Sequence, residues 1–77
     1  MEITLLTLTS GETAKITRLE GGGEFQRKLA SLNLRVGKIV TKITAQPFHG
    51  PLVVEVDNTR VTIGRGMAGR IMVEVTG

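Results

Sequence analysis

The amino-acid sequence predicts a mainly β protein, a small closed or nearly closed barrel of five to six strands with one short helix. Three observations support this prediction. The chain has 77 residues, which leaves room for a single domain covering residues 1–77. Short runs of aliphatic and β-branched residues recur between turn residues, and only one segment has helical periodicity. No spacing along the chain suits a parallel crossover.

The first two strands are predicted at residues 3–8 and 13–19, where β-branched and aliphatic residues are frequent. The turn cluster between them contains Gly11, which supplies any positive φ that the turn requires. In the second strand Ala14 and Ile16 alternate with polar residues. We therefore expect these two side chains to share the buried face.

The one predicted helix covers residues 24–33 and follows a run of three glycines. Phe25, Leu29 and Leu32 stand at i, i+4 and i+7 and form one apolar stripe. Asn33 occupies a position where helices often end in a left-handed residue. A helix of this length is unstable alone, so it is expected to dock on the sheet.

The second half of the chain is predicted to hold four more strands, at residues 38–45, 52–56, 59–63 and 71–75. The phase of the first of these is ambiguous, because its aliphatic residues do not share one parity. Asp57 and Asn58 suit the tight turn of a hairpin. Residues 46–51 are predicted as a loop, and residues 64–69 as a glycine-rich β-turn or 3₁₀ corner.

Composition excludes several classes of function. The chain has no cysteine, which removes disulfides, thiolate metal sites and a cysteine nucleophile. Aromatic residues are 3 %, too few for base-stacking platforms, so no nucleic acid is expected as a partner. Carboxylates are scattered singly, so no catalytic residue is assigned and no enzyme is expected. Residues 64–69 match G-x-G-x-x-G, but too little chain follows for a dinucleotide-binding unit.

The charge is unevenly distributed. Residues 14–44 hold seven cations against two acids, an excess that suits an anionic partner. A solvated face without a partner is the alternative. No segment reaches the length of a membrane-spanning helix, so a cytoplasmic location is expected, with membrane contact only through a partner.

His49 is the only histidine, and it is the one weak candidate for a metal ligand. Together with Glu55 or Asp57 it offers fewer good ligands than a tight transition-metal site needs. An ordinary loop histidine is the alternative.

Several motifs suggest a family. Residues 5–14 fit a Leu-x-x-Leu-x-x-Gly-x-x-Ala pattern, and residues 28–37 fit a basic residue and leucine followed by Leu-Gly-Leu-x-x-Gly. Residues 47–51 fit Pro-x-x-Gly-Pro. A last pattern consists of a hairpin, an arginine, an alanine and alternating aliphatic residues, and it is matched by Val61, Ile63, Arg65, Ala68, Ile71 and Val73. Asn33 stands where the second pattern has glycine, and Asn58 where the hairpin commonly has glycine. Asparagine tolerates positive φ best after glycine. The residues that carry the motifs include Gly11, Leu29, Leu32, Asn33, Leu34, Gly37, Gly50, Pro51, Asn58 and Ala68.

In their order and spacing these motifs resemble the FeoA family of ferrous iron transport, and equally the SH3-like domain of diphtheria-toxin-repressor-type metal regulators. The resemblance implies an SH3-like β-barrel and a cytoplasmic accessory role at the FeoB-type transporter, whose cytoplasmic part carries a GTPase domain. It also implies transition-metal binding, with ferrous iron, manganese or zinc as the candidate ions. Whether the chain forms a homo-oligomer stays open.

The favoured hypothesis is a non-enzymatic interaction module. Its candidate partner-binding residues are Arg27, Lys28, Arg35, Lys38 and Phe48, because arginines beside an aromatic residue are typical of interface anchors. A metal-sensing regulatory domain and a basic nucleic-acid-binding barrel are the alternatives. An arginine finger acting on a partner GTPase, from Arg27, Arg35 or Arg65, is a further hypothesis.

Overall fold

The computed structural model describes residues 1–45 and 50–76. Six antiparallel strands form one sheet in the order β1-β6-β2-β3-β4-β5, so the predicted mainly β fold with a short helix is confirmed. The elements are β1 (Ile3–Thr4), β2 (Thr13–Leu19), α1 (Gly23–Ala30), β3 (Ile39–Ala45), β4 (Leu52–Val56), β5 (Thr59–Ile63), α2 (Arg65–Ala68) and β6 (Ile71–Val75).

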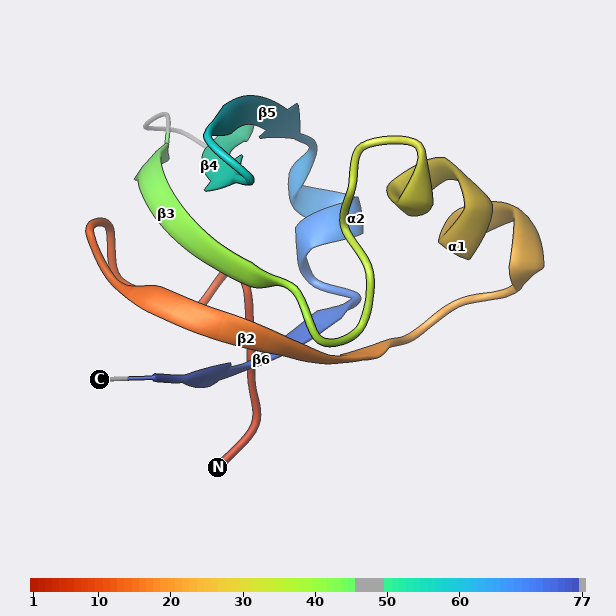
Figure 1. Ribbon diagram of the computed structural model, residues 1–77, viewed down its shortest axis with the longest axis horizontal. Coiled ribbons are helices and arrows are strands. Elements are labelled where there is room, and N and C mark those ends of the chain that lie inside the picture. The colour runs from red at the N-terminus through yellow and green to blue at the C-terminus, as the bar shows by residue number, and fades with distance from the viewer. Residues whose placement is uncertain (46–49, 77) are drawn as a thin grey trace.

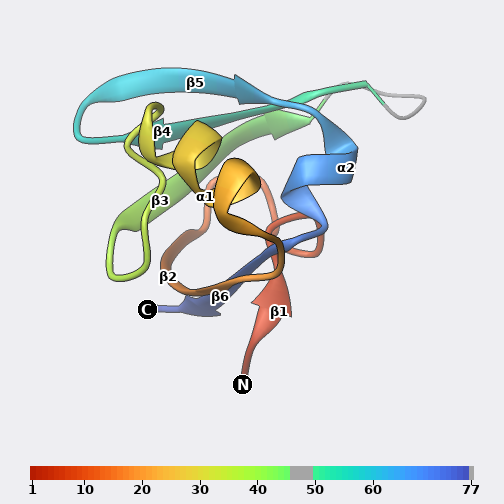
Figure 2. The same ribbon diagram turned by 90° about the vertical axis from the view of Figure 1, so that its right-hand side faces the viewer.

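The sheet is strongly bent (Figure 1). In Figure 2, β4 and β5 pass above, β2 and β6 pass below, and α1 lies between these two arms at the near end. The core fills the inside of this curve with aliphatic side chains from every strand except β1, and from both helices. Its largest fully buried members are Leu5, Leu8, Ile16, Leu29, Leu34, Leu52, Ile63, Ile71, Val40, Val54, Val56 and Val73.

The first strand is much shorter than predicted. After Thr4 the chain turns, and the N–H groups of Thr7 and Leu8 both donate to the Thr4 carbonyl, at 3.0 and 3.3 Å. Leu5 and Leu8 are both buried. A strand would send residues three apart to opposite faces, whereas a turn directs both leucines into the core.

The second strand forms as predicted, and Ala14 and Ile16 are both fully buried. The turn before it passes through Gly11 at φ 92°, a value that favours glycine. Glu12 closes this turn, because its side-chain carboxylate accepts a hydrogen bond of 2.8 Å from the backbone N–H of Thr9.

The helix α1 is followed by a reversal at Asn33, which has φ 66°. The Leu34 N–H donates to the Leu29 carbonyl and the Asn33 N–H to the Ala30 carbonyl, both at 2.9 Å. This pair of bonds, with Leu34 and Leu29 both buried, is the Schellman arrangement. The predicted left-handed role of Asn33 is confirmed. The regular helix ends at Ala30, three residues before the predicted end, because the last turn tightens.

The ambiguous phase of β3 has a structural cause. Val40 and Lys42 are buried, whereas Ile39 is exposed, so inward and outward positions do alternate here. A lysine occupies one inward position and an isoleucine an outward one, so the aliphatic residues do not follow one parity. The pairing with β4 also shifts between Lys42 and Thr44.

The hairpin β4–β5 agrees with the prediction. Leu52, Val54 and Val56 face the core, and Asp57 and Asn58 both have positive φ, 51° and 63°. Two central residues at positive φ are what a type I′ turn requires. The asparagine in place of a hairpin glycine is thus accommodated by its backbone conformation.

The corner at residues 64–69 was predicted as a β-turn or 3₁₀ turn, and this is wrong. It contains one α-helical turn, α2, in which Ala68 and Gly69 donate to the carbonyls of Gly64 and Arg65, both at 3.0 Å. Ala68 is fully buried against the core, and this packing favours the helical turn. In β6 only the first part is buried, because Val75 at its end is exposed.

Candidate functional site

A groove beside α1 brings two of the predicted partner-binding residues together. Its volume is ≈ 590 Å³. Arg27 comes from α1, and Arg35 and Val36 come from the segment after Asn33. The reversal at Asn33 turns the chain back along α1, which places Arg35 on the groove that Arg27 also lines. The lining residues are Leu19, Gly23, Gln26, Arg27, Ala30, Leu34, Arg35 and Val36.

The groove combines unpaired positive charge with an apolar surface. Arg27 and Arg35 are exposed, and neither forms an ion pair with a residue in the described ranges. Val36 is 61 % exposed and presents apolar surface in the same groove as the two arginines. An acidic surface with an apolar side chain would therefore complement this groove.

The other candidate cations differ in their surroundings. Lys28 is exposed on α1 without an ion pair among the described residues. The ammonium of Lys38 lies 2.6 Å from Oδ2 of Asp57, so its charge is already compensated. Phe48 and His49 lie outside the described residues.

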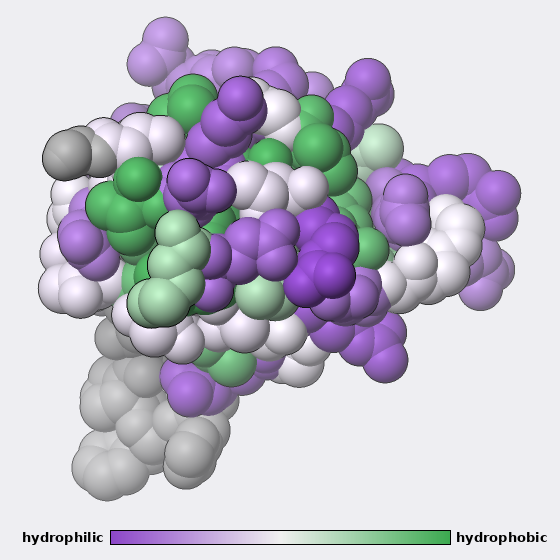
Figure 3. Space-filling model, turned by 90° about the horizontal axis from the view of Figure 1, so that it is seen from below, coloured by the Kyte–Doolittle hydropathy of each residue, from purple (hydrophilic) through white to green (hydrophobic). Residues whose placement is uncertain are grey.

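Exposed aliphatic residues extend from the groove onto the neighbouring strands. Val36 also lines a second, smaller groove of ≈ 380 Å³ together with Lys15 and Val75. Ile39, which is exposed, lies opposite Lys15 in the pairing of β2 with β3. On the face that carries β2 and β6, Figure 3 shows hydrophobic patches between hydrophilic ones. The surface beside α1 is therefore mixed rather than purely basic.

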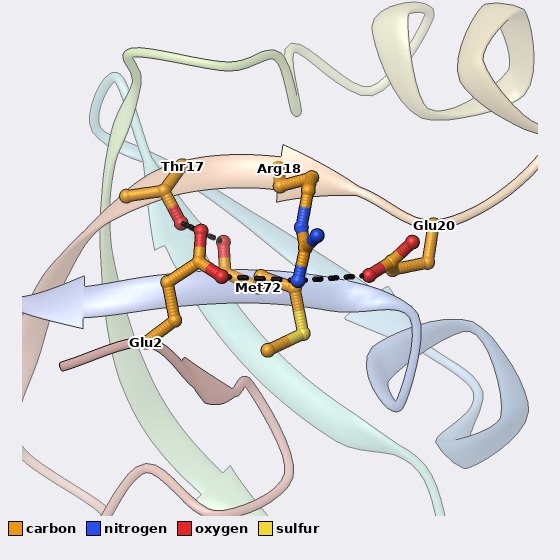
Figure 4. Close-up of polar contacts among 5 residues, drawn as sticks. All are labelled: Glu2, Thr17, Arg18, Glu20 and Met72. Atoms are coloured by element: carbon orange, nitrogen blue, oxygen red, sulfur yellow. Dashed lines mark hydrogen bonds and ion pairs between the residues drawn. The ribbon is translucent and has the colours of Figure 1, made fainter.

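Arg18 is held by carboxylates on the same face (Figure 4). Its guanidinium lies 3.1 Å from Glu2 and 3.0 Å from Glu20, and the Thr17 hydroxyl donates to Glu2 at 2.7 Å. Because these groups are exposed, each ion pair contributes at most about 1 kcal/mol. The network leaves less free charge on β2 than the sequence indicates.

Lys42 is a cation that sequence reasoning did not single out. Its side chain is 5 % exposed, and Nζ donates to the carbonyls of Leu6 and Leu8 at 2.9 and 2.6 Å. Burial lowers the pKa of this lysine, and the nearby Arg65 lowers it further. Lys42 therefore stabilises the turn after β1 and is inaccessible to a partner.

The metal hypothesis finds little support in the donor set. Within residues 1–45 and 50–76 no three histidine, cysteine, aspartate or glutamate side chains gather in a way that could hold a metal ion. Asp57, one proposed companion of His49, is paired with Lys38. Glu55, the other, stands opposite Arg60 in the β4–β5 register. Neither proposed companion of His49 belongs to a cluster of metal ligands among the described residues.

The G-x-G-x-x-G segment also lacks the context of a nucleotide site. It precedes β6, which pairs antiparallel with both β1 and β2, whereas a dinucleotide-binding unit needs a parallel crossover. Among the described residues, no helix is both long and apolar enough to span a membrane.

Residues 3–75 match the family model of the FeoA domain. The chain belongs to the FeoA family. A curated FeoA relative, the "Putative Fe(2+) transport protein A" of Methanocaldococcus jannaschii, is 30 % identical over 64 residues, which are 83 % of this chain and 76 % of that protein. The resemblance inferred from the motifs is thereby confirmed.

A second curated relative of this FeoA domain is a fusion protein. The "Fe(2+) transport protein A/Fe(2+) transporter FeoB fusion protein" of Porphyromonas gingivalis is 30 % identical over 71 residues, which are 92 % of this chain. The match spans only 8 % of the fusion protein.

Solved structures support the same assignment. The chain is 29 % identical to the crystal structure of an iron uptake regulatory protein (FeoA), with a TM-score of 0.90 and 99 % of both chains covered. An iron(II) transport protein A from Clostridium thermocellum is 32 % identical, with a TM-score of 0.92 over 97 % of this chain and 46 % of that one. The SH3-like fold is shared by a manganese-dependent transcriptional repressor. That protein is 21 % identical, with a TM-score of 0.88 over 97 % of this chain and 42 % of that one.

Proposed function

We propose that this FeoA domain is a non-enzymatic accessory module of ferrous iron transport that docks on the cytoplasmic part of a FeoB-type transporter. The observation that carries the proposal is the fusion relative, whose name joins transport protein A and the transporter FeoB in one polypeptide. Partners that are fused in one organism commonly work side by side when they are separate chains. In this proposal ferrous iron is the cargo of the transporter and needs no resident site on the FeoA domain.

The groove beside α1 is the proposed docking surface. Arg27 and Arg35 supply charge that no described carboxylate compensates, and Val36 supplies exposed apolar area between them and β2. Arginine beside an apolar contact is typical of the residues that carry binding energy in interfaces. Lys28 adds positive charge on α1, while Lys38 is expected to contribute less because Asp57 pairs with it.

A binding measurement with three matched variants tests the proposal. The purified chain is titrated with the cytoplasmic part of a FeoB-type transporter from the same source, with and without guanine nucleotide. Arg27→Gln and Arg35→Gln each remove one positive charge from the groove, and we expect each to weaken binding about 10-fold or more. Thr44→Glu changes the net charge by the same amount at an exposed position on β3 that does not line the groove, and it is expected to bind like the parent chain.

Three outcomes would contradict this function. No complex with the transporter part under any nucleotide condition removes the docking role. Equal weakening by Thr44→Glu would show that net charge, not the groove, controls binding. Micromolar binding of ferrous, manganous or zinc ions to the isolated chain, or a steeply salt-dependent shift of duplex DNA, would favour the metal-sensing or nucleic-acid alternative instead.

A further inference from the structure

The strand β5 ends the sheet and has a free backbone edge. In the β4–β5 hairpin Val56 lies opposite Thr59 across a two-residue turn, which makes them a hydrogen-bonded pair. Because such pairs alternate along antiparallel strands, the N–H and C=O groups of Arg60 and Thr62 point away from β4. Within the described part of the chain, no backbone hydrogen bond from these two residues to another segment is present.

This edge carries little of the protection that natural edge strands usually have. β5 contains no proline and no lysine, and its register with β4 runs from end to end without a shift. Bulges, prolines and lysines are the common devices that prevent an edge from pairing with another strand. Only Arg60 places a charge on β5, whose other residues are β-branched, a composition that suits strand pairing.

A groove runs beside this edge. Its volume is ≈ 400 Å³, and it lies between β5 and the turn that follows α1; its lining residues are Ser31, Leu32, Asn33, Val56, Thr59, Arg60, Val61 and Thr62. Leu32 and Val61 are half-buried and form an apolar surface that could receive one side chain. Arg60 is the only charged residue of the lining.

We infer that the β5 edge is a strand-addition site for an extended peptide of another protein, one that carries an acidic residue next to an aliphatic one. The free groups of Arg60 and Thr62 would bond the peptide backbone, the apolar part of the groove would hold its aliphatic side chain, and Arg60 would pair with its carboxylate. A second copy of this chain fits less well, since a two-fold pairing of β5 with β5 brings two Arg60 side chains to one edge of a chain whose net charge is +3.

Amide hydrogen exchange followed by NMR tests this inference directly. The probe is the capped synthetic peptide Ser-Val-Glu-Val-Thr-Ser, added in excess to the whole chain. We expect exchange at the Arg60 and Thr62 amides to slow about 10-fold or more, because these N–H groups gain a partner. The amides of Thr59 and Val61 face β4 and are expected to change little, so they are an internal control.

Altered peptides and variants separate strand addition from other binding. A peptide with N-methyl groups on alternate residues cannot complete the ladder, and a peptide with Lys in place of Glu lacks the charge for Arg60; both are expected to give no protection. Thr62→Pro removes one outward N–H, so the peptide should no longer protect the Arg60 amide from exchange. Thr62→Val keeps that N–H, so the peptide should still protect the Arg60 amide. If Thr62→Pro does not fold, Arg60→Glu serves instead, and it should prefer the Lys peptide.

Several results would overturn the inference. One is that the N-methylated peptide binds as tightly as the unmodified Glu peptide. Another is that the peptide protects amides away from β5 and residues 31–33. A third is that about 1 mM of the Glu peptide protects no amide from exchange. Protection that grows with protein concentration in the absence of peptide would assign the edge to a second copy of this chain. The inference does not depend on the transporter, so failure of the docking experiment leaves it standing.

Discussion

At the scale of single residues, Lys42 is the most consequential polar side chain of the core. Its ammonium connects β3 to two carbonyls of the turn after β1, a segment whose leucines are buried. Lys42→Met keeps the length and apolar stem of the side chain but leaves both carbonyls without this donor. We expect the free energy of unfolding to fall by about 2 kcal/mol. Urea denaturation of the parent chain and of Lys42→Met measures this difference. An unchanged midpoint would show that the Lys42 hydrogen bonds do not stabilise the turn after β1.

The lowered pKa of Lys42 also predicts a pH dependence. In the unfolded chain this lysine keeps its ordinary pKa of 10.5, so at pH values between the folded and unfolded pKa the unfolded state binds more protons. Stability therefore rises with pH in that window. Compared with Lys42→Met, the parent chain should gain stability as the pH approaches 10.5. Urea titrations of both proteins at several alkaline pH values measure this gain. If the free energies of unfolding of the two proteins change with pH in the same way, the prediction is wrong.

Asn33 controls the reversal that brings Arg35 to the groove. At φ 66° a residue with an ordinary Cβ is strained, and Asn33→Ala should cost about 1 kcal/mol of stability. Asn33→Gly is expected to be close to neutral, because glycine relieves the backbone strain but raises the conformational entropy of the unfolded chain. Thermal unfolding of the three proteins provides the comparison, and equal loss in both variants would count against the backbone argument.

At the scale of elements, the start of α1 depends on close packing between Gly21 and Phe25. A Cβ added at Gly21 would lie 2.8 Å from Cγ of the Phe25 ring, whereas at Gly23 it would meet nothing within 4 Å. The Phe25 ring is half-buried and packs against the core, and Arg70 lies over it, 5.4 Å from its centroid, so moving the ring would disturb these contacts. Gly21→Ala should destabilise the protein by about 1–3 kcal/mol.

Gly23→Ala is the matched control for this prediction. Gly23 is the first residue of α1, and alanine there should stabilise the helix by up to about 1 kcal/mol. The two substitutions add the same methyl group two residues apart and are expected to change the unfolding midpoint in opposite directions. A change of the same sign in both would contradict the proposed Gly21–Phe25 contact.

The elements also show which parts of the fold the sequence can predict. Local signals were sufficient for β2, for the β4–β5 hairpin and for the positive φ of Asn33 and Asn58, because alternation and turn chemistry act over a few residues. They failed where tertiary contacts decide the conformation. The residues after Thr4 have strand propensity, yet they turn because both leucines pack into the core. The helical form of α2 likewise depends on the burial of Ala68.

At the scale of the whole molecule, the sequence predicted an excess of positive charge but not its distribution. Ion pairs compensate Arg18 and Lys38, and burial removes Lys42 from the surface. Arg27 and Arg35 are eight residues apart and meet at one groove only because the chain reverses after α1. No local pattern contains this information. The proposed docking surface is therefore smaller and more specific than the charge excess suggests.

This distribution predicts how the complex with the transporter part responds to salt. Two or three unpaired cations at an exposed surface give a modest electrostatic contribution, which salt screens. We expect the dissociation constant to rise about 10-fold between roughly 50 and 500 mM NaCl. Arg27→Gln and Arg35→Gln should each flatten this dependence in the same titration. Tighter binding at high salt would instead show that apolar contact around Val36 dominates.

The pairing of β1 with β6 has a practical consequence for work with this domain. Ile3 lies opposite Val73 in the register, and both ends of the chain leave the molecule on the side away from α1 (Figure 1). A tether attached at either terminus would therefore leave the helix side pointing into free solution. Immobilised samples and tandem fusions would both present the same surfaces to a binding partner.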